Sequence, residues 1–420
     1  MEIQTEVLIC GAGSAGLTAA LACARQGVET MLIEKAGFAG GIITAVGLPY
    51  FDGIADSRTR RIVVRGIPLE LLVRSGICSS TAVSLPVHAP TIANIEAFKL
   101  LADRLLQAEA THLRTLFHAV ACDVETRGDR IRAVRLACKE GLVTVLPKVV
   151  VDCTGDGDIA FWSGAPVVKT SPLQPMTLHF RIGNVREHAG LRAAAQTQAV
   201  AAHNEGELQY FYGPGILFLF ARNEAYVHAV RVPGDASDSF DLTRAEMQGR
   251  ADAWTLFERW KKYVPGFENS YFVSSGPSIG VRETRRIVGQ HVLTEDDIRQ
   301  RRVFEDAIAT GCWYLDIHPH EATPGSVHKA PSYQPAPYDI PYRSLLPQRI
   351  ANLLVAGRCH SASQLAASST RVTVTAMAMG QAAGIAAAMA VQGKRMPAEL
   401  MGEEVRQVLH GLGAGPFSAK

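Results

Sequence analysis

The chain has 420 residues, of which 47% are hydrophobic and 20% charged, and this balance excludes a disordered or fibrous protein. Its 42 basic and 40 acidic residues leave a formal net charge of +2, which argues against nucleic-acid binding as the main task. The eight cysteines include no C-x-x-C pair, so we expect reduced thiols in a cytoplasmic protein and no metal site. The length predicts two to three domains.

Two stretches of the sequence are weighed as membrane-directed segments, and neither is expected to be one. Residues 1–6 carry two acids and no base, and the apolar run behind them is four residues long, so no signal peptide is expected. The stretch 372–391 is long enough to be weighed as a span, but it consists largely of small residues and contains Gln381. Small side chains drive lipid insertion weakly, so we expect a packed internal helix and no membrane span.

The first elements of the chain are expected to form one compact unit. An apolar strand over 6–10 is followed by a helix over 17–26 and by a second strand over 29–33. Between the first strand and the helix lies the pattern G-x-G-x-x-G, which runs from Gly11 to Gly16. The second strand ends at Glu34, 18 residues beyond Gly16. This order is typical of a Rossmann-like dinucleotide-binding unit.

Each glycine of this pattern stands where a side chain would interfere with the turn, the ligand or the packing. Gly11 allows a tight turn, Gly13 lets the backbone approach a pyrophosphate, and Gly16 lets the helix pack closely on the strand. The N-terminus of the helix then offers free N–H groups and the positive end of its dipole to the phosphates, while Glu34 holds ribose hydroxyls. We include in this nucleotide-binding site the neighbouring residues Ser14, Ala15 and Lys35.

Further along the chain, two more segments are expected beside the same ligand. Gly40, Gly41 and Ile42 follow the second strand, and a strand over 149–153 ends in a turn that contains Thr154, Gly155 and Asp156. Between them we expect a helix over 92–110 and a strand-rich stretch over 119–151 with a turn at 127–129. The acids of the 156–158 turn lack the remaining ligand spacing of a calcium loop.

A second domain is expected between residues 166 and 340, inserted into the first. Strands are predicted over 176–182, 215–220 and 225–232, and helices over 243–263 and 295–310. Six prolines between 319 and 341 predict a long loop. The middle of the chain contains no second G-x-G-x-x-G, so we expect no NAD(P)H-binding domain and only poor direct reduction by NAD(P)H.

The last part of the chain returns to a nucleotide-binding pattern. A buried strand over 352–356 ends at Gly357 and Arg358, and a helical stretch over 375–384 contains Thr375 and Gly380. The N-terminus of that helix is expected to stabilise negative charge on the bound ligand. Arg358 is expected to meet the pyrophosphate.

With these motifs, the sequence resembles the FAD-dependent oxidoreductases of the glutathione-reductase-like FAD fold, distant relatives of the fumarate reductase and succinate dehydrogenase flavoproteins. The resemblance runs from end to end and includes the segments 280–286, 316–318, 340–345 and 380–384. It implies an α/β flavoprotein whose FAD-binding domain has a parallel sheet in three layers, formed by 1–165 and 341–420, with an α+β substrate domain over 166–340. It also implies FAD as cofactor, without a substrate. Ile42 and Ile43 stand where fumarate-reductase relatives attach FAD to a histidine.

Four residues are candidates for catalysis. His360 follows Gly357 and Arg358, and it is either a base beside the flavin, a covalent flavin attachment or a packing residue. His318 shares one face of an extended segment with Asp316, as a catalytic or a structural pair. Arg282 and Arg371 can hold a substrate anion or belong to internal ion pairs.

A weaker candidate of the same kind is His179 on the predicted strand 176–182. We therefore expect an oxidoreductase that moves a hydride from a small molecule, at a C–H next to O or N, onto FAD. Oxygen, a quinone or a carrier protein is then the electron acceptor. A reductase of an activated C=C bond and a non-catalytic flavoprotein subunit or redox module remain alternatives, and a homo-oligomer stays open.

Overall fold

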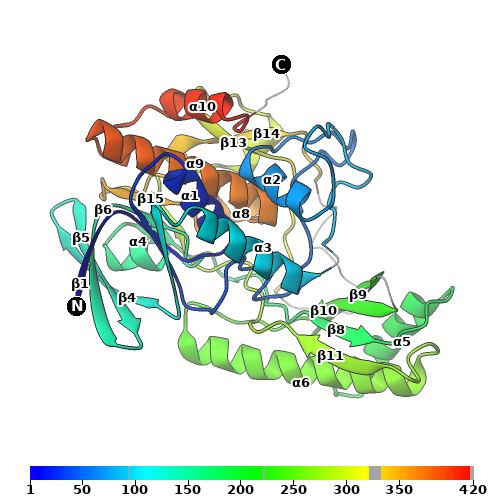
Figure 1. The fold of residues 1–420 in the computed structure, drawn as a ribbon. Coiled ribbons are helices and arrows are strands. Elements are labelled where there is room, and N and C mark those ends of the chain that lie inside the picture. The colour runs from blue at the N-terminus through cyan, green and yellow to red at the C-terminus, as the bar shows by residue number, and fades with distance from the viewer. Residues whose placement is uncertain (93, 221–222, 321–332, 417–420) are drawn as a thin grey trace.

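The computed structural model describes residues 1–92, 94–220, 223–320 and 333–416 (Figure 1). One part is built on a large, mostly parallel sheet with helices packed against it. The other part, which holds a smaller sheet and the long helix α6, extends from one side (Figure 1). The predicted α/β fold is confirmed.

The large sheet has seven strands in the order β3-β2-β1-β6-β5-β4, and β15 also pairs with β6. Five of its strands run parallel: β1 (Glu2–Cys10), β2 (Thr30–Glu34), β3 (Leu113–Phe117), β6 (Gly141–Asp152) and β15 (Leu353–Val355). The hairpin of β4 (Val120–Arg127) and β5 (Arg130–Cys138) extends the sheet in antiparallel fashion.

Both faces of the parallel strands are covered, which explains their continuous apolar sequences. Alternate residues such as Val7 and Ile9 face a core shared with helices, whereas Leu8 and Cys10 face a second core shared with β5 and the short helix α4 (Asp158–Trp162). The sheet is therefore the middle one of three layers. The helices that pack in the first core include α1 (Ser14–Ala24), α2 (Ile67–Arg74), α3 (Ile95–Ala108) and α9 (Thr373–Gly393).

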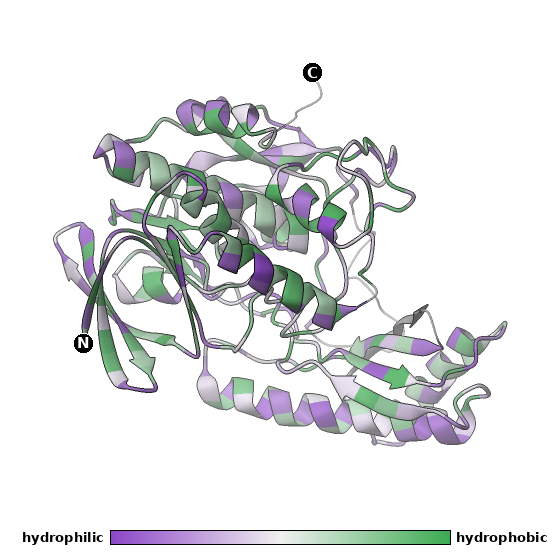
Figure 2. Ribbon diagram, viewed as in Figure 1, coloured by the Kyte–Doolittle hydropathy of each residue, from purple (hydrophilic) through white to green (hydrophobic). Residues whose placement is uncertain are grey.

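Helix α9 is the helix that passes a membrane-span test of length and composition among the described residues, and 83% of its most apolar window is buried. It packs against α1 so closely that a Cβ at Gly380 would lie 2.0 Å from the carbonyl oxygen of Ala15. The Thr18 hydroxyl donates to the Met377 carbonyl at 2.7 Å across the same contact. Small residues here allow helix–helix packing, as expected for an internal helix, and both helices are largely hydrophobic in Figure 2.

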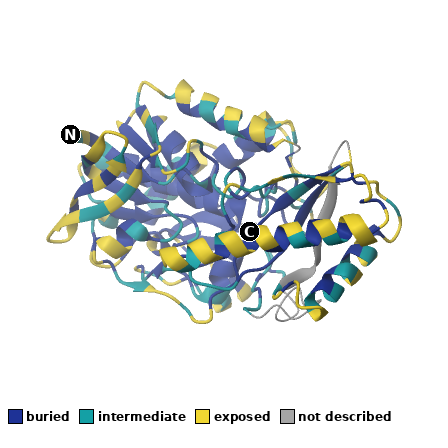
Figure 3. Cartoon of the chain, turned by 90° about the horizontal axis from the view of Figure 1, so that it is seen from below, coloured by how far each residue is buried: buried dark blue, intermediate teal, exposed yellow. Residues whose placement is uncertain are grey.

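The smaller sheet is antiparallel, in the order β11-β8-β10-β9. Its elements are β8 (Phe180–Gly183), β9 (Phe211–Phe220), β10 (Glu224–Val230) and β11 (Tyr271–Ser275), packed with α5 (Leu191–Asn204) and α6 (Ser239–Tyr263). These elements have their own hydrophobic core, which includes Phe180 and Trp260. Helix α6 presents one face to this core and the other to solvent (Figure 3).

This second core ends earlier in the chain than the predicted domain boundary. Its last residue is Ile279, whereas Leu293, Ile298 and Ile308 already belong to the core of the large sheet. Residues 287–320 and 333–340 thus pack with the part built on the large sheet, because their apolar side chains complete its cores. The helices and strands after the second core are β12 (Arg286–Ile287), α7 (Glu295–Arg299), β13 (Ala307–Gly311) and β14 (Tyr338–Pro341). Strand β12 pairs with β7 (Val167–Val168).

The predicted helix over 295–310 is wrong in its second half. A capping box between Thr294 and Asp297 starts α7, but Arg301 has a φ of +51° and the helix does not continue. Residues 307–311 instead form β13, which pairs with β14. The predicted loop over 319–341 lies partly outside the described residues, and its last residues form β14. The remaining elements are η1 (Tyr342–Ser344), α8 (Gln364–Thr370), η2 (Pro397–Glu399) and α10 (Gly402–Gly411).

Candidate active site

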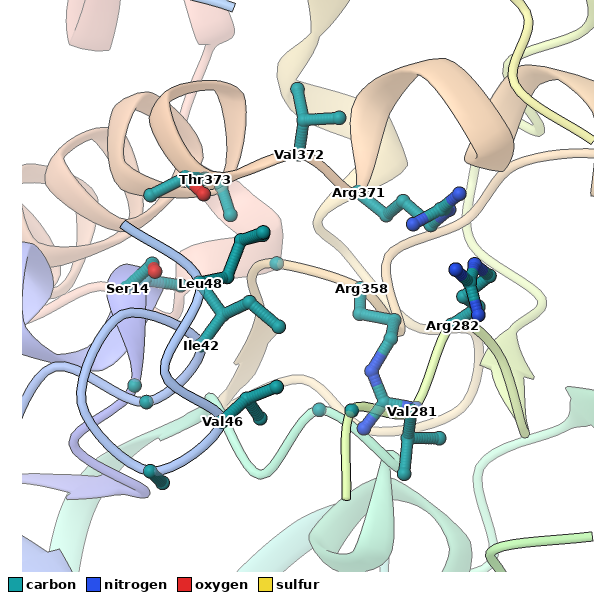
Figure 4. A pocket seen from close by; sticks show the side chains of 18 of the residues that line it. Ser14, Ile42, Val46, Leu48, Val281, Arg282, Arg358, Arg371, Val372 and Thr373 are labelled. Atoms are coloured by element: carbon teal, nitrogen blue, oxygen red, sulfur yellow. The ribbon is translucent and has the colours of Figure 1, made fainter. Parts of the chain in front are cut away.

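The part of the chain that holds the smaller sheet and α6 is called the insert. A cavity of about 950 Å³ lies where the insert meets the carboxyl ends of the parallel strands (Figure 4). At one end it is lined by the loop between β1 and α1, and at the other by side chains of the insert such as His179 and Arg282. Carboxyl ends of parallel strands and domain interfaces are where ligands commonly bind. The cavity therefore joins the predicted nucleotide site to the predicted catalytic residues.

The loop at the start of α1 has the geometry expected for holding phosphates. Gly11 has a φ of +95°, and a Cβ there would lie 2.6 Å from the carbonyl oxygen of Cys153. A Cβ at Gly16 would lie 1.7 Å from the carbonyl oxygen of Gly11. Gly13 caps α1 without a side-chain hydrogen bond, so the first-turn N–H groups are left for a ligand. The buried Ser14 hydroxyl also has no hydrogen-bond partner among the described residues.

The second glycine pair lies directly against this loop. Gly41 has a φ of +51°, and a Cβ there would be 2.7 Å from the Cα of Gly13. The Gly40 N–H donates to the Ala12 carbonyl at 2.8 Å. Gly41 lines the cavity together with Ile42, while Gly40 does not. The pair thus brings the chain after β2 alongside the expected pyrophosphate.

Glu34 lines the cavity at the end of β2, next to Lys35. One carboxylate oxygen accepts the Ala12 N–H at 2.7 Å and the other accepts the Ala36 N–H at 2.8 Å. These bonds orient the carboxylate and leave further lone pairs for ribose hydroxyls.

The turn after β6 lies next to the glycine loop and adds to the cavity wall. Asp152 is fully buried, accepts hydrogen bonds from the Thr154 N–H and hydroxyl, and burial raises its pKa. Thr154, Gly155 and Asp156 line the cavity. The Arg358 guanidinium lies 2.9 Å from Asp156, and a Cβ at Gly155 would be 2.8 Å from it. Arg358 is thus held across the turn by Asp156, and it lines the cavity beside Gly357.

The start of α9 also reaches the cavity, through Val372 and Thr373. Two of its first N–H groups are already occupied: the Thr373 N–H donates to the Asp52 carboxylate at 3.1 Å, and the Val374 N–H donates to the Asp52 carbonyl at 3.0 Å. Asp52 therefore acts as the cap of this helix, and burial raises its pKa.

Gly16 has the packing role expected of it, whereas Thr375 and Gly380, which were predicted to bind the cofactor, also pack against the chain instead. Gly16 and Gly380 do not line the cavity, because each lies where two backbones touch. Thr375 is fully buried, does not line the cavity either, and faces Gly53. Their positions within the motifs were correct, but the contacts are made to the chain itself.

His360 is not at the cavity. Its side chain is fully buried, and its Nε2 is 2.7 Å from the Thr370 hydroxyl. Burial, and next the charge of Arg286, lowers its pKa to about 3. The expectation that His360 is a base beside the flavin is corrected: the turn after Gly357 directs this side chain into the core.

Arg282 does line the cavity, but its guanidinium is occupied (Figure 4). Nη1 donates to the Pro175 carbonyl at 2.5 Å and to the Thr177 hydroxyl at 2.6 Å, and Nη2 lies 3.1 Å from Nε2 of His228. Since an arginine only donates, Nε2 of His228 accepts this bond and the ring is neutral. Burial is the main cause that lowers the pKa of His228 well below its ordinary value.

His318 connects the two parts of the protein. Its Nδ1 accepts from Arg231 at 3.0 Å, and its Nε2 lies 3.1 Å from the Asp316 carboxylate. Asp316 in turn is 3.2 Å from the Arg371 guanidinium at the start of α9. Burial, then Arg282 and Arg231, lower the pKa of His318. With both ring nitrogens engaged, His318 orients its neighbours rather than accepting a proton.

His179 lines the cavity, and among the described residues its Nε2 makes no hydrogen bond. Its Nδ1 is hydrogen-bonded to the Tyr226 hydroxyl, and its ring centroid is 4.6 Å from that of His228. Burial, then Arg282 and Arg231, lowers its pKa to about 3. The imidazole is therefore neutral and able to exchange a proton with a bound molecule.

Sequence reasoning ranked His179 low and did not identify Tyr226, His228 or Arg231. A signal was present, because Tyr226 and His228 alternate on β10 and share one face of the strand. The described part of the chain contains no group of three or more His, Cys, Asp or Glu side chains placed to hold a metal ion.

Comparison with known proteins agrees with this site. The family model described as FAD dependent oxidoreductase matches residues 6–409. Dihydrolipoyl dehydrogenases from Haemophilus influenzae and Buchnera aphidicola are 46% and 52% identical over 46 residues, which is 11% of this chain and 10% of each relative. The matched stretch thus spans about a tenth of the length of these curated relatives.

Solved structures are similar to this chain at low identity. The flavin-dependent brominase Bmp2 has a TM-score of 0.48 and 12% identity, over 96% of this chain and 83% of that one. A geranylgeranyl bacteriochlorophyll reductase-like protein from Thermoplasma acidophilum has a TM-score of 0.46 and 13% identity, over 98% and 84%.

The residues around the cavity fit FAD, because the unpartnered Ser14 hydroxyl and the uncapped start of α1 supply donors for its pyrophosphate. The family match spans nearly the whole chain, so FAD is the cofactor. The chain belongs to the FAD-dependent oxidoreductase family.

Proposed function

We propose that the protein oxidises a small anionic organic molecule at a C–H next to oxygen or nitrogen, and that His179 takes up the proton. FAD, when bound, supplies the two-electron chemistry of hydride transfer. The observation that carries the proposal is the pairing of a neutral histidine with arginines in a cavity that continues into the nucleotide site. Oxygen, a quinone or a carrier protein then receives the electrons.

Arg371 is the best candidate to hold the anion. Its Nη2 is bound to Asp316, but its buried Nε has no hydrogen-bond partner among the described residues. A buried guanidinium donor without an acceptor is costly, and a carboxylate supplies such an acceptor with matching geometry. Figure 4 shows Arg371 and Arg282 at the same end of the cavity.

His179 suits the proton transfer because its basicity depends on what is bound. Without a ligand, burial and the positive charges of Arg282 and Arg231 lower its pKa. An anion near these arginines offsets part of their potential and raises the pKa of the imidazole. The ring thus becomes a better base when the substrate is present, and the Tyr226 hydroxyl keeps it oriented.

The test is an anaerobic screen with the purified yellow protein. Hydroxy acids and amino acids are mixed with it alongside the corresponding neutral amides and alcohols, and bleaching of the flavin absorbance is followed. We expect acids to bleach the flavin and neutral analogues to fail. Bleaching by the neutral compounds alone would contradict the anionic substrate, and bleaching by none of them would contradict the dehydrogenase.

A second candidate is a reductase of an activated C=C bond. The hydrogen bond between His179 and Tyr226 is compatible with both tautomers of the ring. When Tyr226 donates to Nδ1, the Nε2 atom carries the proton and can deliver it to a carbon. Reoxidation of the photoreduced protein by an unsaturated carboxylate, without oxygen, would favour this direction.

A further inference from the structure

The cavity has a second wall, made of flat side chains. His88, Trp313 and Tyr314 all line it, together with Tyr50. The rings of His88 and Trp313 are stacked, with centroids 5.4 Å apart at 29°, and Trp313 lies 4.8 Å from Tyr314. Since these residues come from two distant segments, the stack is a product of the fold.

Polar contacts hold this aromatic wall in place, one of them from Arg60, which also lines the cavity. The Arg60 guanidinium lies 2.7 Å from Nδ1 of His88, and the Ser369 hydroxyl donates to the Trp313 carbonyl at 2.5 Å. Burial and Arg60 lower the pKa of His88, so its ring is neutral. Neither Trp313 nor Tyr314 takes part in the hydrophobic core of the large sheet. Their rings belong to the cavity rather than to the core.

The aromatic wall and the anion site are close in the chain and in space. Trp313 is three residues from Asp316, whose carbonyl and carboxylate both bind Arg371. Three residues span at most about 10 Å, which is the scale of one ring with a short substituent. A molecule with its anionic group at Arg371 therefore has its body beside the ring of Trp313.

We propose that the substrate is a planar, conjugated carboxylate, in which an aromatic or unsaturated group is attached near the reacting carbon. This inference rests on the proposed function, because it assumes the anion site at Arg371. Aromatic pairs gain more than area burial alone, so a flat ring is preferred to a saturated ring of equal size and charge by about 2- to 10-fold in affinity.

The experiment measures binding rather than turnover. Benzoate, cyclohexanecarboxylate and benzamide are titrated into the FAD-loaded protein, and changes in the flavin spectrum and in tryptophan fluorescence are recorded. The first two differ only in the flatness of the ring, and the first and third differ in charge. Each titration is repeated with Trp313→Leu, with Trp313→Phe, and with Trp162→Leu as a control outside the cavity lining.

We expect benzoate to bind more tightly than cyclohexanecarboxylate, Trp313→Leu to remove the difference, and both Trp313→Phe and Trp162→Leu to retain it. Equal binding of the two carboxylates to the wild-type protein, an unchanged preference in Trp313→Leu, or no binding of any probe would overturn the inference. Binding of benzamide alongside benzoate with equal affinity would instead contradict the anion site and leave the aromatic wall supported. If Trp313→Leu loses its flavin, Trp313→Met takes its place as the variant without a ring, and an unchanged preference in Trp313→Met would overturn the inference.

Discussion

The two ends of the cavity are built in different ways. At the nucleotide end, the contacts come from a few short loops, and much of the chemistry is supplied by backbone groups around Gly11, Gly13 and Gly41. At the substrate end, side chains converge from separate segments, among them His179, Arg282 and Arg371. The first site is local and the second is assembled by the insert.

This difference has consequences for how each end responds to change. At the nucleotide end, the backbone can approach the cofactor only because the loops carry no side chains there. A single added side chain can therefore fill the space that the cofactor needs. The substrate end depends on charges that are buried next to neutral histidines, so it responds to charge and to pH. Substitutions at the two ends should therefore separate cofactor binding from chemistry.

The largest effect is expected for Gly13→Val. A Cβ at Gly13 would meet no atom closer than 4.0 Å, so the chain can fold with a side chain there. That side chain occupies the space in which the pyrophosphate approaches the backbone, and we expect the protein to purify colourless. Absorbance of bound flavin after desalting measures this. Gly411→Val, at the end of α10 with no neighbouring atom within 4 Å, should remain yellow, and a yellow Gly13→Val protein would contradict the assignment.

The second largest effect is expected on the rate of flavin reduction. His179→Ala should lower the rate of flavin reduction by a substrate by about 10²–10⁴-fold while FAD stays bound, because the proton loses its acceptor. Stopped-flow reduction under anaerobic conditions is the measurement. His360→Gln is the matched control, since His360 lies in the core, and its rate should stay near that of the wild-type protein. A large loss in the control with none in His179→Ala would restore His360 as the candidate base.

A smaller effect is expected for Arg371→Gln. Loss of a charge-assisted hydrogen bond should raise KM for an anionic substrate by about 10- to 100-fold. The affinity for a neutral analogue should change little, and the comparison of both ligands isolates the charge. An equal loss for both ligands would assign Arg371 to the structure of the Asp316 network instead.

The smallest effect concerns stability and lies within the insert. Asp252 is 2% exposed, receives one hydrogen bond from Gln248 at 2.7 Å, and burial raises its pKa to about 6. Because the folded state holds this proton more tightly than the unfolded state, ionisation of Asp252 costs stability as the pH rises from about 4 to above 6. Asp252→Asn should therefore be more stable by about 1–3 kcal/mol at pH 8, and equally stable at pH 4. Denaturant melts at both pH values test this; a pH-independent difference would assign the effect to packing.

The predictions from sequence were strongest where function depends on consecutive residues. The strand, glycine loop, helix and second strand that end at Glu34 form as expected, and the turn at 154–156 lines the same cavity beside them. The prediction of His360 was wrong because the direction of one side chain after a tight turn is not encoded by its distance from a motif. The helix over 295–310 was wrong because pairing with β14 outweighs the local preference of residues 307–311.

The sequence alone was enough to predict the FAD-binding unit. A phosphate-binding loop requires glycines at fixed spacing, and a buried parallel strand requires a continuous apolar run, so both are visible in consecutive residues. Which charged side chains meet at the substrate end could not be read in this way. His228 lines the cavity, Tyr226 contacts His179 and Arg231 contacts His318, because the small sheet packs against the segment of Asp316 and His318. Contacts between segments so far apart depend on how two cores are joined, and nothing in the local sequence records that geometry.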